Sequence, residues 1–466
     1  MLFRSLTEQQ VSDAPVEIRA AEAKGYKDRK YVLAISELDC TGCGSCTHVC
    51  PAKEKAISLV PLSDRDLLTA RWEYLNEIEE AEIAEKQRNT VKGSQFLQPL
   101  LEFSGACAGC AETPYAKLIT QLYGDRMVNI NTAGCAAVWG GSSPTISYTK
   151  NRNGHGPCFG YSLFENEAEY GFGMYMGANE VRKNLAREVG CLVKADIPDD
   201  VREAMQEWLD GFDDPAETRE RADKLETALE RYKDDSVLAG IYGKRHYFIK
   251  RSWWILGGDG WAYDIGFGGL DHVMAYGENI NVFVFDTEVY SNTGGQSSKS
   301  TPVSAVAKFA AAGKKTKKKD LGRMAMSYGY IYVAQVCMGA DMEQTVKAIT
   351  EAERYNGPSL IIGYSPCINH GVKAGMGNSQ IQQKRAVESG YWALYRYNPE
   401  AADNGENPFT LDSKDPSASF RDYLMSETRF TSLMKTNPDQ AEQMFEKCEK
   451  DAMDRIAYYK KLDAER

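Results

Sequence analysis

From residue 247 to about residue 370, apolar segments alternate with helical ones, and this alternation constrains the fold more than any other feature. The apolar segments read SWWILGGDG, NVFVFDTEVY, YIYVAQV and PSLIIGYSPC, and helical stretches run through DHVMAYG and EQTVKAITEAERY. Near-continuous apolar strands that alternate with helices are typical of a parallel sheet with both faces covered. We therefore predict an α/β fold with a doubly wound, mostly parallel sheet.

Three glycine-rich or polar loops follow strands of this sheet, at residues 257–260, 286–296 and 364–370. Ligands of such folds bind beyond the carboxyl ends of the strands. The three loops are therefore expected to meet at one edge of the sheet and to form the site.

The first two loops carry oxygen ligands. Gly258, Asp259 and Gly260 do not follow the G-x-G-x-x-G dinucleotide pattern. The next strand, however, leads into FDTEVYSNTGGQ with Thr287 and Val289. The Asp259 carboxylate, Thr287 hydroxyl and Val289 carbonyl suit Mg²⁺, which commonly keeps phosphates as its remaining ligands. Either loop alone would more often be an ordinary turn, but the pair predicts a Mg²⁺-dependent diphosphate site.

A second feature is the segment LDCTGCGSCTHVCPAK, which holds Cys40, Cys43, Cys46 and Cys50 before a proline. Cysteines this close do not form unstrained disulfides, and C-x-x-C-x-x-C-x-x-x-C-P is typical of iron–sulfur ligation. The fourth cysteine of such a run ligates a different cluster in two-cluster ferredoxins, and we find no second run in this chain. We expect Cys40, Cys43 and Cys46 to share a cluster whose fourth ligand comes from elsewhere. Cys50 then points toward the place of another cluster, unless it serves as the fourth ligand itself.

The composition excludes some classes of protein. The chain has 466 residues, 43% apolar and 26% charged, which suits two or three globular domains. Its net charge of −11 argues against nucleic acid or an anionic membrane as the main partner. No apolar run approaches the ~18 residues of a membrane span, and the start lacks the apolar core of a signal peptide. We expect a cytoplasmic protein, whose twelve cysteines include metal ligands rather than disulfides.

The stretch GGDGWAYDIGFGGLDHVMAYGENINVFVFDTEVYSNTGGQSSKSTP resembles the thiamine diphosphate motif of pyruvate:ferredoxin (or flavodoxin) oxidoreductases. The resemblance runs from about residue 31 to residue 430 and includes CTGCGSC, SGACAGCAETPY, SLFENEAEYGFGM and YSPCINHG. It matches the C-terminal portion of the family's long polypeptide. It implies thiamine diphosphate, Mg²⁺ and 4Fe-4S clusters as cofactors, with Gly258, Asp259 and Gly260, Thr287 and Val289 at the diphosphate and its Mg²⁺.

The same resemblance implies a 4Fe-4S cluster close to the thiamine, held by Cys107, Cys110, Cys135 and Cys367. The spacing of Cys107 and Cys110, and the place of Cys367 after a strand at the Mg²⁺ edge, agree with it. Asn292 matches a family residue near the reactive thiazolium carbon and is implied to be catalytic, although a turn asparagine is an equally good interpretation.

We predict four regions: a partial ferredoxin-like α+β module with a 4Fe-4S cluster (1–62), a helical connector (63–94), a domain for thiamine diphosphate and the proximal cluster (95–436), and a C-terminal helix (437–466). Within the third region, residues 95–180 have little helical period and are expected to be site-forming loops. Residues 196–235 are expected to be a charged helical insertion.

Other residues are expected to be structural: Cys158, Cys191, Cys337, Cys448, His48, His155 and His370. The lysine-rich segment 313–320, GKKTKKKD, is expected to be a solvated loop, or alternatively a docking patch for an acidic electron carrier or for a CoA phosphate.

The resemblance implies oxidative decarboxylation of pyruvate with CoA to acetyl-CoA and CO₂, with electrons passing through the clusters to ferredoxin or flavodoxin. In the family, upstream domains supply much of the substrate pocket, the carboxylate that activates the thiamine, the CoA site and another cysteine run. None of these has a match here, so we expect the chain to need upstream domains or a companion subunit, within a homodimer. Two alternatives remain: an electron-transfer iron–sulfur protein with a non-catalytic thiamine fold, and a 2-oxo acid oxidoreductase of another specificity.

Overall fold

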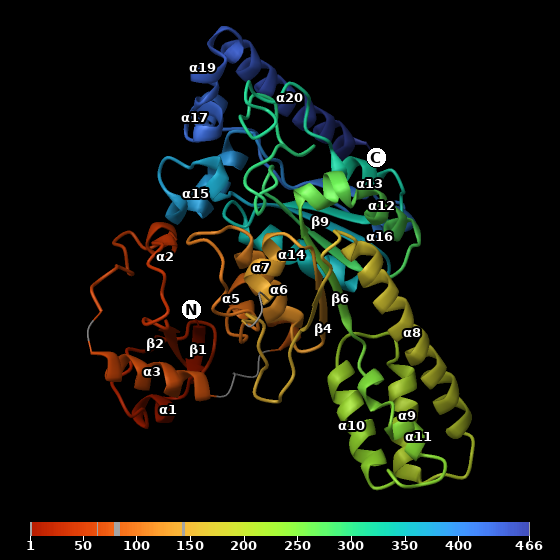
Figure 1. Cartoon of the computed structure of the whole chain (residues 1–466). Helices are drawn as coiled ribbons and strands as arrows, with labels where there is room; N and C mark the ends of the chain where they lie inside the picture. Colours follow the sequence, from red (N-terminus) through yellow and green to blue (C-terminus); the bar gives the residue numbers. More distant parts are fainter. Residues whose placement is uncertain (1, 63, 79–83, 142–144, 466) are drawn as a thin grey trace.

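The computed structural model describes residues 2–62, 64–78, 84–141 and 145–465 (Figure 1). Residues 63 and 79–83 of the predicted connector, residues 142–144 of the predicted main domain and the two terminal residues lie outside the described part.

The described residues include an eight-stranded sheet of order β11-β10-β8-β9-β7-β6-β4-β5. Its strands are β4 (Met127–Asn131), β5 (Cys158–Tyr161), β6 (Ser252–Gly258), β7 (Asn281–Asp286), β8 (Tyr332–Val336), β9 (Ser359–Tyr364), β10 (Tyr395–Tyr397) and β11 (Phe409–Leu411). All neighbours from β8 to β5 run parallel, whereas β10 and β11 add an antiparallel edge. The predicted α/β fold with a mostly parallel sheet is confirmed, and the four predicted strands are β6 to β9.

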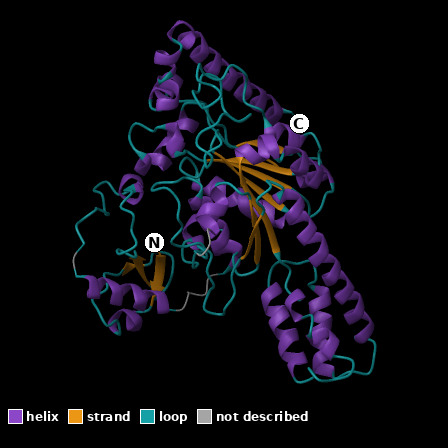
Figure 2. Ribbon diagram, in the orientation of Figure 1, coloured by secondary structure: helices purple, strands orange, loops and turns teal. Residues whose placement is uncertain are grey.

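Helices cover both faces of this sheet (Figure 2). From residue 91 onward, and outside residues 167–242, the described helices are α5 (Val91–Ser94), α6 (Thr113–Tyr123), α7 (Cys135–Gly141), α12 (Phe267–Ala275), α13 (Leu321–Met326), α14 (Met342–Arg354), α15 (Ser379–Glu388), α16 (Pro399–Asp403), α17 (Phe420–Met425), α18 (Thr428–Thr431), α19 (Leu433–Thr436) and α20 (Pro438–Ala464). Short turns of helix are η2 (Gly260–Ile265), η3 (Ile368–His370) and η4 (Met376–Asn378).

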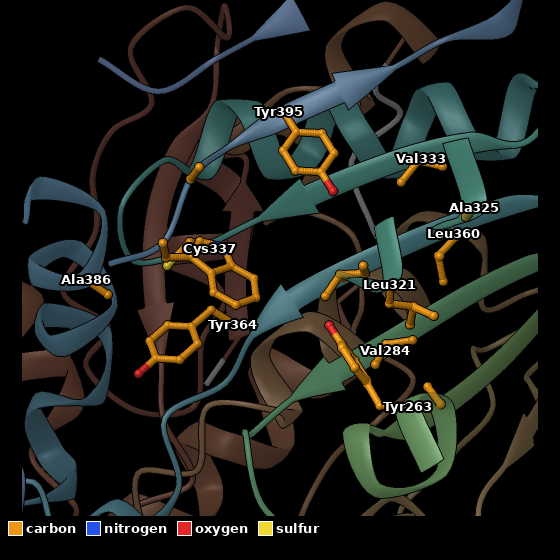
Figure 3. Close-up of a cluster of buried hydrophobic side chains, with 14 of the residues drawn as sticks. Tyr263, Val284, Leu321, Ala325, Val333, Cys337, Leu360, Tyr364, Ala386 and Tyr395 are labelled. Atoms are coloured by element: carbon orange, nitrogen blue, oxygen red, sulfur yellow. The ribbon is translucent and has the colours of Figure 1, made fainter. Parts of the chain in front are cut away.

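Successive residues of each central strand enter different cores. Val282 and Val284 of β7 lie in one apolar core, and Phe283 and Phe285 lie in another across the sheet. This follows from the two-residue period of a strand, and it explains why the strands have few polar residues. Figure 3 shows the first core, where strand residues such as Val284 and Leu360 pack near Leu321 of α13.

The expectation that residues 95–180 are loops was wrong in part, because this segment contains α6, β4, α7, β5 and the start of α8 (Glu167–Leu192). The small residues of this segment let its helices and strands pack closely against each other. A Cβ at Gly141 of α7, for example, would lie 2.1 Å from the ring of Phe159 in β5.

Helices α8 to α11 form an arm that projects from the sheet (Figure 1). Besides α8 the arm contains α9 (Asp199–Asp210), α10 (Thr218–Glu230), α11 (Ala239–Tyr242) and the short turn η1 (Arg245–Tyr247). It has a core of its own, which includes Leu185, Trp208, Leu225 and Phe248.

The N-terminal module is a three-stranded antiparallel sheet with helices, beside α5 to α7 (Figure 1). Its elements are β1 (Leu2–Leu6), β2 (Ala21–Glu22), β3 (Lys30–Ala34), α1 (Glu8–Ser12), α2 (Ser45–Val49), α3 (Arg65–Glu77) and α4 (Glu85–Arg88). Helix α2, which carries Cys46, packs against α15 and η4, which belong to the part of the chain with the eight-stranded sheet. Within the described part of the chain, no helix is both long and apolar enough to cross a membrane.

Candidate functional site

A pocket lies at the carboxyl edge of the sheet, where the loops after β6 and β7 meet. These strands are parallel neighbours, and Gly258 at the end of β6 pairs with Phe285 of β7. Among the predicted site residues, the pocket is lined by Gly258, Gly260, Thr287, Val289 and Asn292. The sheet thus brings the two predicted loops together.

Thr287 lies at the centre of this pocket, and three oxygens surround its hydroxyl. Its Oγ1 lies 2.8 Å from Oδ1 of Asp259, 2.9 Å from the carbonyl oxygen of Val289 and 2.6 Å from Oγ of Ser291. One hydroxyl proton cannot serve the Asp259 and Val289 oxygens together. A cation bound among these oxygens would accept lone pairs from all of them, which is the ligand chemistry of Mg²⁺.

Asp259 is fully buried beneath the pocket. Burial, followed by the nearby Asp286 carboxylate, raises the pKa of Asp259 to about 8. Its Oδ1 also accepts a hydrogen bond from the backbone N–H of Thr287, and Oδ2 accepts one from the Ser298 hydroxyl. A carboxylate held in place without a basic partner of its own is suited to binding a metal ion.

Further buried charges lie behind Asp259, and we call them together the carboxylate cluster. Its members are the acids Asp259, Asp286, Glu288 and Glu427 and the bases Lys318 and Arg429. With Asp259 also ionised, which a cation bound to it would favour, four acids and two bases leave two negative charges uncompensated. A divalent cation at Asp259 would supply the two missing positive charges, so the buried residues fit Mg²⁺.

The loop between Thr287 and Val289 is strained. Glu288 has φ 59°, in the left-handed region that non-glycine residues rarely adopt. Its carboxylate is held by Lys318 at 2.9 Å and by Arg429 at 2.8 Å. These two cations outweigh the effect of burial and lower the pKa of Glu288 to about 2. The ion pairs therefore fix the conformation that presents the Val289 carbonyl.

Lys318 corrects the expectation for the segment 313–320. Its Nζ lies 2.8 Å from Asp286 and 2.9 Å from Glu288, and little of its side chain is exposed. Neither a solvated loop nor a docking patch describes this residue, because the chain folds its ammonium group inward to compensate buried carboxylates. The sequence offered no sign of which lysine does so.

A second pocket adjoins the first and contains all four cysteines assigned to the proximal cluster. Cys107, Cys110, Cys135 and Cys367 line a cavity of about 110 Å³, which Thr287 and Asn292 also line. No group of three or more His, Cys, Asp or Glu in the described residues is arranged around a single metal ion. A bulkier group such as an iron–sulfur cluster fits thiols that are spread around a cavity.

The charge of this second pocket also fits such a group. Burial raises the pKa of Cys110, Cys135 and Cys367, and nearby Glu112 raises all three further. The thiols therefore need positive charge to become thiolate ligands, and iron supplies it.

Glu112 lies between the two pockets and lines both, which the sequence analysis missed. Burial raises its pKa to about 7, and its Oε2 accepts a hydrogen bond from Trp139 at 2.7 Å. Its place two residues after Cys110 was the only signal available.

The cysteines of the N-terminal run differ in exposure. Cys40 is exposed, Cys43 and Cys46 are half-buried, and Cys50 is buried with the Ala56 N–H donating to its sulfur at 3.4 Å. Their ligand roles stay predictions.

Cys43 lies beside the loop that carries the first two cysteines of the second pocket. Burial opposes ionisation of Cys43, but hydrogen bonds that include the Gly109 backbone lower its pKa overall. Gly109 stands between Cys107 and Cys110 in the chain. The two sets of cysteines therefore meet at this point of the structure.

The other predicted residues have the following places. Asn292 is exposed and lines both pockets. His370 is buried with its Nε2 2.6 Å from the Thr287 carbonyl oxygen, so it supports the loop. Of the cysteines left as structural, Cys337 and Cys448 are buried, and Cys158 and Cys191 are exposed.

Comparisons with known proteins agree with this geometry. A family model described as "Thiamine pyrophosphate enzyme, C-terminal TPP binding domain" matches residues 239–362, which include Asp259, Thr287 and Val289. The chain is 54% identical to the pyruvate-flavodoxin oxidoreductase of Klebsiella pneumoniae over 97% of its own length and 39% of that protein. It is also 54% identical to the pyruvate:ferredoxin oxidoreductase of Moorella thermoacetica, over 95% of its own length and 38% of that protein.

A more distant relative is the mitochondrial pyruvate dehydrogenase (NADP+) of Euglena gracilis, 45% identical over 94% of this chain and 24% of that protein. The chain thus spans about two fifths or less of the length of these relatives. The resemblance to part of the pyruvate:ferredoxin and pyruvate-flavodoxin oxidoreductases, predicted from the motifs, is confirmed.

Proposed function

We propose that this chain is the thiamine diphosphate-binding and iron–sulfur part of a pyruvate:ferredoxin or pyruvate:flavodoxin oxidoreductase. The complete enzyme would convert pyruvate and CoA to acetyl-CoA and CO₂ and pass the electrons to ferredoxin or flavodoxin. The observation that carries the proposal is the junction of two pockets, one with a buried Mg²⁺-type oxygen set and the other with four cysteines.

Asp259, Thr287 and Val289 would hold Mg²⁺, and Gly258 and Gly260 would let the backbone approach the diphosphate. A side chain at Gly260 would collide with Tyr290, since its Cβ would lie 2.4 Å from the ring. When bound, thiamine diphosphate supplies the electron sink for removal of CO₂ from a 2-oxo acid.

The chain's own residues would orient and protonate groups near that cofactor. Glu112, with a pKa of about 7, can hold or release a proton at its carboxyl oxygens where the two pockets join. Asn292 would present its amide at the shared opening of the pockets, which is the basis for keeping it as a candidate catalytic residue.

Cys107, Cys110, Cys135 and Cys367 would hold a 4Fe-4S cluster beside the thiamine site. Cys40, Cys43 and Cys46 would hold most of a second cluster, with Cys50 as an additional iron–sulfur ligand. The closeness of Cys43 to Gly109 supports an electron path from the first cluster to the second.

Several features of the complete enzyme belong to the same proposal: CoA as a substrate, upstream domains or a companion subunit, a homodimer, and a cytoplasmic location in anaerobic metabolism. The names of the relatives favour pyruvate over other 2-oxo acids.

The test is calorimetric titration of the chain with thiamine diphosphate in the presence of Mg²⁺. Asp259→Ala removes the only carboxylate among the proposed Mg²⁺ ligands and should weaken binding at least 100-fold. Asp271→Ala, in helix α12 outside the pocket, is the matched control and should bind like the parent chain. Equal affinity in the Asp259→Ala variant and the parent would refute the site.

A further inference from the structure

A larger cavity lies at the opposite edge of the sheet from the candidate site. It is lined by Ser252 at the start of β6, Asn281 at the start of β7 and residues of α8 at the base of the helical arm. Its volume is about 610 Å³, within the ~300–1,000 Å³ of small-molecule sites. None of the predicted site residues lines it.

The cavity has an excess of basic groups. Four basic side chains line it, Arg182, Lys183, Lys250 and Arg251, against three carboxylates, Asp213, Glu278 and Glu353. Glu353 is already satisfied, because it pairs with Arg126 at 2.7 Å and accepts hydrogen bonds from Ser252 and Asn281. Among the described residues, none of the four basic side chains forms an ion pair within 4.0 Å. In a chain with a net charge of −11, four basic side chains without an ion pair in one cavity are unexpected.

Arg182 is the most informative of the four, since only 8% of it is exposed. Its guanidinium lies 3.8 Å from the centre of the Phe212 ring and donates one hydrogen bond to the Phe212 carbonyl. Its buried Nε has no hydrogen-bond partner. The Asp213 carboxylate attracts Arg182 without forming an ion pair with it, and a buried cation that lacks an ion pair is costly unless a ligand compensates it.

Three neighbouring side chains have related environments. Burial lowers the pKa of Lys250 and of Arg251, so both charges are also partly removed from water. Asn281 donates its amide to Glu353, while its buried Oδ1 has no partner. Lys250 Nζ donates to the Asp213 carbonyl and Arg251 donates to the His246 carbonyl, so each basic group has further N–H donors left for a ligand.

We propose that this cavity binds a small metabolite through a dianionic oxyanion, a phosphate or a dicarboxylate, held by Arg182, Lys250 and Arg251. Guanidinium groups bind such oxyanions with paired hydrogen bonds. The proposal does not depend on the thiamine site.

Calorimetry can test this on the full 466-residue chain, saturated with Mg²⁺ and thiamine diphosphate so that the candidate diphosphate site is occupied. Inorganic phosphate and malonate are the two probes. We expect one of them to bind with one site per chain, and Lys250→Met to weaken that binding at least tenfold. Stronger binding of phosphate would identify a phosphorylated ligand, and stronger binding of malonate a dicarboxylate.

Arg187→Met is the matched control, because Arg187 lies on the same helix as Arg182 with 68% of its side chain exposed and pairs with Glu180 at 3.0 Å. It should leave the affinity unchanged. Arg182→Met should abolish binding of the probe. If the Arg182→Met chain does not fold, the affinity of the Lys250→Met chain decides the test. Absence of binding heat with both probes, or equal affinity in the parent chain and Lys250→Met, would overturn the proposal.

Discussion

At the scale of single residues, the environment of a side chain decides its role more than its type does. Lys318 is one of five lysines in GKKTKKKD, yet it reaches two buried carboxylates. Glu112 is one acid among many, yet it lies between two pockets. Both residues reach their partners only through the folded structure, so sequence patterns could not single them out.

We predict that Lys318→Met destabilises the fold by about 3 kcal/mol, because it leaves Asp286 and Glu288 buried with less positive charge. Urea unfolding of the cofactor-free chain measures this difference. Lys315→Met, at an exposed position of the same segment, should change the stability by less than about 0.5 kcal/mol. If the two variants were equally stable, Lys318 would not be needed to compensate the buried carboxylates of Asp286 and Glu288.

Glu112 gives a prediction for pH. Burial raises its pKa from 4.5 to about 7, so the folded chain binds a proton that the unfolded chain releases. Its contribution to stability is therefore complete below pH 4.5 and is lost as the pH rises through 7. Since one pKa unit corresponds to ~1.4 kcal/mol, the free energy of unfolding should fall by about 3 kcal/mol at most over this pH range.

The test compares Glu112→Gln with the parent chain, both without cofactors, by urea unfolding from pH 4.5 to pH 8. The amide oxygen of the glutamine side chain in the variant can still accept the Trp139 hydrogen bond. The free energy of unfolding of the variant should therefore fall less than that of the parent between pH 4.5 and pH 8. Glu207→Gln, at an exposed site on α9, should follow the parent curve. Parallel curves for Glu112→Gln and the parent would contradict the raised pKa.

At the scale of elements, strands β6 to β9 could be predicted because they are long and almost wholly apolar. Strand β4 could not, because its sequence MVNIN carries two buried asparagines that hydrogen-bond to each other at 2.9 Å. Strands β10 and β11 have three residues each, too few for a period. The Mg²⁺-type ligands were predictable for the same reason as the central strands: Asp259 and Thr287 directly follow two of them.

The loop between Cys107 and Cys110 gives the prediction at this scale. Gly109 has φ +78°, and a Cβ there would lie 2.3 Å from the carbonyl oxygen of Met376. Gly109→Ala should therefore destabilise the chain by about 1–3 kcal/mol and lower the iron retained after anaerobic reconstitution. Gly240→Ala in the helical arm, where the added Cβ would also meet nothing within 4 Å, should keep the iron content of the parent and lose no stability. If the Gly109→Ala variant had the stability and iron content of the parent, the close approach of Gly109 to Met376 would not be needed to hold this loop in place.

At the scale of the whole molecule, the candidate site is bordered by exposed apolar side chains. Phe164 is 83% exposed in the loop that leads to the pocket residue Glu165, and Ile265 at the end of η2 is 67% exposed. Phe309 is 92% exposed beside Lys308, whose N–H donates to the Gly295 carbonyl in the loop after β7. Apolar groups gathered around a pocket mark a surface that another part of the protein covers. The relatives are more than twice as long as this chain.

This arrangement leads to a prediction about activity. The chain alone should bind thiamine diphosphate, because Asp259, Thr287 and Val289 all lie within it. It should nevertheless fail to release CO₂ from pyruvate, because an uncovered pocket does not exclude water and lacks the remaining substrate contacts. Supplying the rest of the Klebsiella pneumoniae relative as a separate polypeptide should restore both CO₂ release and electron transfer.

The measurement is anaerobic reconstitution with iron, sulfide, Mg²⁺ and thiamine diphosphate, followed by an assay of pyruvate- and CoA-dependent reduction of a one-electron dye. We expect no turnover above background for the 466-residue chain, although calorimetry of the same sample should detect the bound cofactor. The Asp259→Ala chain is the control, since it should stay inactive even with the added polypeptide because it cannot hold Mg²⁺. Substantial turnover by the unassisted chain would mean that its own residues complete the substrate pocket, and that the exposed apolar border has another purpose.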